Sequence, residues 1–131
     1  MFTMRKVVLL GACAGLLCGS VSADVDLKDF DDDLMRTMGD TIKILEPDIT
    51  AKNLASATEE AAVFRDGFKY VSDYFAAKGG AADAVKYAND SQELTAKVLQ
   101  ALAENNFNEA AISARALSKS CKGCHDVYKP P

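Results

Sequence analysis

The chain has 131 residues, enough for one domain preceded by a removable leader. Residues 1–23 hold two of the fifteen basic residues and none of the nineteen acidic ones, so residues 24–131 carry a formal net charge of −6. Because nucleic acids and anionic membranes are bound through basic surfaces, this balance argues against both as partners. A domain this small buries a smaller share of its surface than a larger one, so a covalent cross-link or a bound cofactor helps to stabilise it.

Residues 1–23 have the three parts of a secretory signal peptide. Two basic residues precede an apolar stretch over residues 7–17, and small residues lead to Ala23. This order predicts export to the periplasm with cleavage before Asp24. The stretch is too short to favour a permanent membrane anchor, so we expect no membrane insertion after processing. Lipid attachment at Cys13 is a competing interpretation that rests on a loose motif match.

The first two expected helices carry apolar stripes with helical spacing. The first runs from Asp26 to Leu45, and Pro47 is expected to stop it. Its stripe consists of Leu27, Phe30, Leu34, Met38, Ile42 and Leu45. The second begins after an N-cap at Thr50 and extends to about Ala77, with apolar residues every three or four positions.

The last two expected helices complete the domain. The third spans roughly Ala82 to Glu104. The fourth follows an N-cap at Asn106, with Glu109 three residues later, and runs to about Tyr128. Its inward stripe consists of Ala110, Ala114, Leu117, Cys121, Cys124 and Tyr128. Four such helices with short connections predict an all-α, antiparallel up-down-up-down four-helix bundle.

The run Cys121-Lys122-Gly123-Cys124-His125 is the C-x-x-C-H pattern of haem c attachment. On a helix, positions i, i+3 and i+4 share a face. Two thiols can therefore add to the two haem vinyl groups while the imidazole reaches the iron from the same side. Glycine at position 123 is expected to leave room for the porphyrin edge, which a side chain there would crowd. We expect one covalent haem c on the last helix, with Cys121 and Cys124 as thioether attachments and His125 as the proximal iron ligand.

Other chemistry for the two cysteines is disfavoured. A zinc site needs a fourth ligand, and residues 24–131 contain one histidine and two cysteines. A thioredoxin-like dithiol places its reactive cysteine at a helix N-terminus, whereas these cysteines lie far along a helix. Peroxidase-type turnover lacks a second histidine to serve as distal base. We therefore expect no enzyme activity.

The residues alone do not decide which ligand takes the other axial position of the iron. With one histidine in the chain, it is a methionine, a weaker ligand, water, or empty. Met35 and Met38, both on the first expected helix, are the two methionines of residues 24–131. Either can be core filler, which is common for methionine on an apolar stripe. Periodicity mildly favours burial of Met38 without saying which thioether faces the iron.

The run from Lys119 to Lys129 resembles the C-terminal signature of the class II cytochromes c. This family of exported four-helix bundles includes cytochromes c prime and their low-spin, methionine-ligated relatives. The segment from Leu34 to Gly39 is similar to the distal segment of the low-spin branch. The resemblance implies that Met35 is the distal ligand, with Met38 as the alternative. The chain departs from the family at Asp31, where an arginine near the haem propionates is frequent.

The resemblance implies a periplasmic cytochrome that transfers single electrons between redox partner proteins through a His/Met-ligated haem. The alternative is a five-coordinate protein that binds nitric oxide or carbon monoxide, as cytochromes c prime do. A homodimer paired through the first two helices is a further expectation from the family, which the residues do not establish. With Asp31 in place of the arginine, the candidates for pairing with the propionates are Arg36, Lys122 and Lys129.

Overall fold

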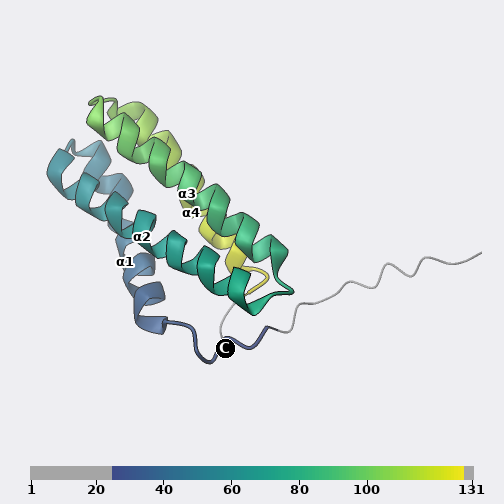
Figure 1. Ribbon diagram of the computed structural model, residues 1–131. Helices are drawn as coiled ribbons and strands as arrows, with labels where there is room; N and C mark the ends of the chain where they lie inside the picture. The colour runs from purple at the N-terminus through teal and green to yellow at the C-terminus, as the bar shows by residue number, and fades with distance from the viewer. Residues whose placement is uncertain (1–24, 129–131) are drawn as a thin grey trace, which may run out of the picture.

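The computed structural model describes residues 25–128, which form four α-helices in an antiparallel up-down bundle (Figure 1). The helices are α1 (Asp32–Thr50), α2 (Leu54–Lys78), α3 (Ala82–Ala103) and α4 (Phe107–His125). α2 packs on α3, α3 packs on α4, and α1 contacts both α2 and α4. The predicted fold class is confirmed. The expected leader and Lys129 lie outside the described residues.

The predicted apolar stripes meet along the bundle axis. The fully buried large apolar side chains come from all four helices and comprise Leu45, Ile49, Phe64, Val98, Leu102 and Leu117. Each such side chain contributes about 1.5–3 kcal/mol through burial. A second cluster, around Phe75, Ala88 and Tyr128, lies nearer the C-terminal end of α4. Within residues 25–128, no helix combines the length and apolar character needed to cross a membrane.

The start of α1 differs from the prediction, because the helix begins at Asp32 and not at Asp26. Asp31 is the N-cap, and its Oδ1 accepts a hydrogen bond from the backbone N–H of Leu34 at 2.9 Å. Acidic residues in the first turn also interact favourably with the helix dipole. Leu27 and Phe30 therefore precede the helix, although both still pack inward.

The expected stop at Pro47 is also wrong, because α1 continues through it to Thr50. Proline removes one backbone N–H donor, but its own carbonyl accepts from the N–H of Ala51 at 2.9 Å. Ile49, which is fully buried, ties the last turn to the core. Thr50 does not cap α2, since its hydroxyl donates to the carbonyl oxygen of Glu46 at 2.9 Å within α1.

The other helix ends lie within about a turn of the predicted positions. α2 follows Asn53 as its N-cap. Asn106 is confirmed as the N-cap of α4, where its side-chain oxygen accepts from the N–H of Glu109 at 3.2 Å. α4 ends at His125, and the chain then turns so that Tyr128 packs back onto the bundle.

Candidate functional site

An apolar cavity of about 190 Å³ lies at one end of the bundle. Antiparallel order brings together the N-terminal halves of α1 and α3 and the C-terminal parts of α2 and α4, and all four line the cavity. The four residues predicted to hold the haem, and the alternative ligand Met38, come from α1 and α4 and all line this cavity: Cys121, Cys124, His125, Met35 and Met38.

The C-x-x-C-H residues occupy the last turns of α4. Cys121 and Cys124 are half-buried, whereas His125 is exposed at the cavity edge. Burial raises the pKa of both thiols to about 11, and the negative charge of Asp83 adds to the effect at Cys124. Both thiols are therefore protonated at neutral pH. The attacking thiol of a dithiol oxidoreductase instead has a lowered pKa.

The two methionines of α1 are packed differently. Met38 is 4% exposed, and its thioether lies against Gly67 of α2. A β-carbon added to Gly67 would stand 2.4 Å from the Met38 Sδ. Met35 is partly buried and packs in the cluster that contains Cys124. Met38 therefore fills a gap between α1 and α2, and Met35 is the less enclosed thioether.

Two glycines near the predicted site have different surroundings, and of the two Gly39 lines the cavity. Gly39 of α1 has no atom within 4 Å of an added β-carbon, so this part of the wall is bare backbone. Gly123 faces α3, where an added β-carbon would lie 3.1 Å from Cε1 of Tyr87. The contact seen at Gly123 is thus a close approach of α4 to α3, which was not anticipated from the motif.

The chain after α4 is tied to the start of α3. Tyr128 is buried, and its hydroxyl donates to Oδ1 of Asp83. The same oxygen accepts from the backbone N–H of Ala84 at 3.0 Å. Burial, together with the Asp83 carboxylate, raises the pKa of Tyr128 to about 12. Tyr128 was part of the predicted inward stripe, but nothing local in the sequence indicates its partner Asp83.

Two of the three candidates for pairing with haem propionates are engaged elsewhere, and the third, Lys129, lies outside the described residues. Arg36 pairs with Asp33 at 2.8 Å and Lys122 pairs with Asp126 at 2.9 Å, in both cases on an exposed helix surface. Asp31 caps α1. Over residues 25–128, no group of three or more His, Cys, Asp or Glu side chains gathers in a way that could hold a metal ion.

Comparisons with protein-family models, with curated proteins and with solved structures find no match to this chain. Function must therefore be inferred from the cavity and its residues.

The donor set fits a covalently attached haem. Two thiols and an imidazole lie within one turn of α4 and line one cavity. Thioether groups from α1 line the same cavity, and its other walls are largely apolar, as in most cofactor sites. The bare backbone at Gly39 leaves room on the α1 wall for a flat group.

Proposed function

We propose that this protein is an exported cytochrome with one covalent haem c, which carries single electrons between partner proteins in the periplasm. The observation that carries this proposal is one apolar cavity lined by the C-x-x-C-H residues of α4 and by two methionines of α1. Bound haem c would supply an iron atom that alternates between the ferric and ferrous states.

Different residues of the chain would attach the haem and bind its iron. Cys121 and Cys124 would hold the haem through thioether bonds, and the His125 imidazole would be an iron ligand. Met35 is the favoured ligand from the α1 side, because the Met38 thioether is enclosed against Gly67. With one imidazole and one thioether as ligands, the iron would have a higher reduction potential than with two nitrogen ligands.

The walls of the cavity contribute by excluding water. Phe68, Val71 and Phe75 of α2 present apolar surface to the cavity. An apolar surround would limit the access of solvent to the iron and thereby influence its reduction potential. It also slows the entry of external ligands, which suits a carrier of electrons.

Optical spectra of the exported full-length protein test this function, with Met35→Ala and Met38→Ala as a matched pair. We expect a low-spin ferric spectrum with a methionine-to-iron charge-transfer band. Met35→Ala should lose that band and become high-spin, whereas Met38→Ala should keep it. A wild-type protein that is high-spin and takes up carbon monoxide when reduced would instead indicate a five-coordinate gas-binding protein. A low-spin spectrum that neither substitution alters would rule out a methionine ligand.

A further inference from the structure

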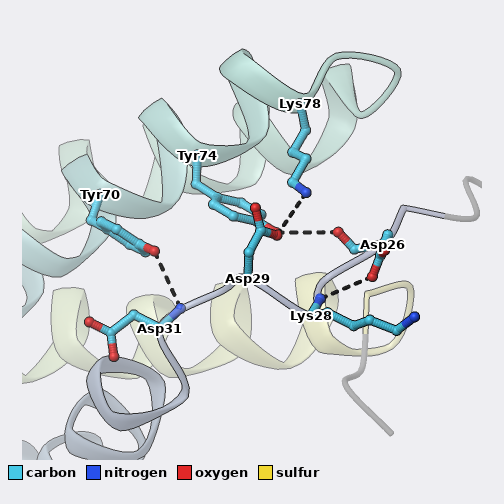
Figure 2. Close-up of polar contacts among 7 residues, drawn as sticks. All are labelled: Asp26, Lys28, Asp29, Asp31, Tyr70, Tyr74 and Lys78. Atoms are coloured by element: carbon cyan, nitrogen blue, oxygen red, sulfur yellow. Dashed lines mark hydrogen bonds and ion pairs between the residues drawn. The ribbon is translucent and has the colours of Figure 1, made fainter.

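Residues 25–31 precede α1 as a non-helical segment, which we call the strap. Figure 2 shows the strap running beside α2, with the Asp29 carboxylate directed toward Tyr74 and Lys78 and the backbone nitrogen of Asp31 directed toward Tyr70. Leu27 and Phe30 of the strap line the cavity and pack in the same cluster as Phe75 and Cys124. The strap therefore forms one wall of the proposed haem site.

Asp29 is the main polar anchor of the strap. Its Oδ1 accepts a hydrogen bond from the Tyr74 hydroxyl at 2.8 Å and pairs with the Lys78 Nζ at 2.7 Å (Figure 2). The Tyr74 hydroxyl also lies 3.3 Å from the carbonyl oxygen of Asp26. The Lys78 side chain is 29% exposed, less than the other lysines and arginines seen in ion pairs within residues 25–128. Tyr74 and Lys78 are four residues apart, so one face of α2 supplies both contacts.

Aromatic contacts hold the end of the strap nearest α1. The Phe30 ring stands edge-on to the rings of Tyr70 and Tyr74, with centroid distances of 5.5 and 4.8 Å. Edge-to-face pairs of this kind stabilise a contact beyond the apolar area that they bury. The Tyr70 hydroxyl accepts from the backbone N–H of Asp31 at 3.3 Å. These contacts keep the Phe30 side chain at the cavity.

The strap is a part of the cavity wall that lies outside the packed helices. The cavity of about 190 Å³ is smaller than the roughly 300–1,000 Å³ of most small-molecule and cofactor sites. Apart from Tyr128, which follows α4 and is bonded to Asp83 of α3, the remaining walls belong to helices that pack on one another along the bundle. The strap is joined to the bundle by its anchors on α2 and by its continuation into α1.

We propose that the strap is a lid on the cavity, and that the anchor formed by Asp29, Tyr74 and Lys78 determines how readily small molecules enter. The relevant class is small ligands of ferric iron, for which imidazole serves as the probe. The effect on iron chemistry rests on the proposed haem function, whereas the covering of the cavity does not.

The first measurement is amide hydrogen exchange in the exported full-length protein. Lys78→Met removes the ion pair, and Tyr74→Phe removes the hydroxyl while keeping the ring beside Phe30. Lys69→Met is the matched control, because it breaks the exposed 2.5 Å pair with Asp73 on the same helix. We expect exchange across the strap to be about two- to tenfold faster in the first two variants, as for the loss of one hydrogen-bonded anchor, and unchanged in the control.

The second measurement is the rate of imidazole binding to the ferric protein, at concentrations where the rate is proportional to imidazole. The same two variants should bind faster by a similar factor, and the control should match the wild type. Faster exchange with an unchanged binding rate would overturn the lid, as would equal behaviour of Lys78→Met and Lys69→Met. If the protein carries no haem, the proposed function fails, and alkylation of Cys124 replaces imidazole. Alkylation that the anchor variants do not accelerate would then refute the lid independently.

Discussion

The close contact between Met38 and Gly67 predicts that substitutions at these two positions are energetically coupled. A β-carbon at position 67 would stand 2.4 Å from Sδ and 2.9 Å from Cε of Met38, so the thioether must shift. Overpacking of this kind costs about 1–3 kcal/mol. Alanine in place of glycine in a helix interior returns about 1 kcal/mol. Gly67→Ala should therefore lower the free energy of unfolding by about 0–2 kcal/mol.

The effect should reverse when Met38 is first replaced. Met38→Ala alone should cost about 2–5 kcal/mol, because a 4% exposed side chain leaves a cavity. In that background the new methyl group at position 67 meets no sulfur and fills part of the space. Gly67→Ala should then raise the free energy of unfolding by about 1 kcal/mol through helix propensity.

Denaturant unfolding of the wild type, the two single variants and the double variant measures this coupling as a double-mutant cycle. We expect a coupling energy of about 1–3 kcal/mol, the overpacking cost that Met38 imposes. If Gly67→Ala stabilises the wild type and the Met38→Ala variant equally, Met38 does not occupy the gap between α1 and α2. Enclosure of the Met38 thioether would then no longer favour Met35 over Met38 as the iron ligand.

Three further changes test the packing of the bundle. The Glu60 side chain has a buried Oε2 atom with no hydrogen-bond partner within residues 25–128. Burial of this carboxyl group, together with the nearby Asp48, raises the pKa of Glu60 to about 7. The free energy of unfolding should therefore fall by about 1 kcal/mol as pH rises from 4.5 through 7, a value reduced because this side chain is partly exposed. Glu60→Gln should abolish that fall, which unfolding curves recorded at several pH values would measure. Tyr128→Phe should cost about 1 kcal/mol in denaturant unfolding because the bond to Asp83 is lost, and an unchanged midpoint would contradict that bond. Asn106→Ala should cost about 1 kcal/mol by loss of the α4 cap, and equal thermal midpoints would show that the cap contributes nothing.

The fold was predictable where local signals and periodicity agree. Asn106 caps α4 in the structure as its position before an amphipathic run indicated. The start of α1 was misjudged because Leu27 and Phe30 continue the helical spacing although they are not helical. What holds them is contact with residues some forty positions away, such as the aromatic contact of Phe30 with Tyr70. Such contacts leave no local trace in the sequence.

In the candidate site, too, local features were predictable and tertiary contacts were not. The common face of Cys121, Cys124 and His125 follows from helix geometry and needed no knowledge of tertiary packing. The different settings of the two methionines depend on Gly67, which lies on another helix. Its role in admitting Met38 was invisible to periodicity, because a glycine on an apolar face carries no side chain to signal a contact.

The mass of the exported, purified protein under denaturing conditions tests the central claim most directly. We expect the mass of residues 24–131 plus one haem, with neither Cys121 nor Cys124 open to alkylation. Replacing either cysteine by serine should leave one thioether bond at most. Export with the bare polypeptide mass and two alkylatable thiols, from a host that attaches haem c to other proteins, would contradict covalent haem attachment.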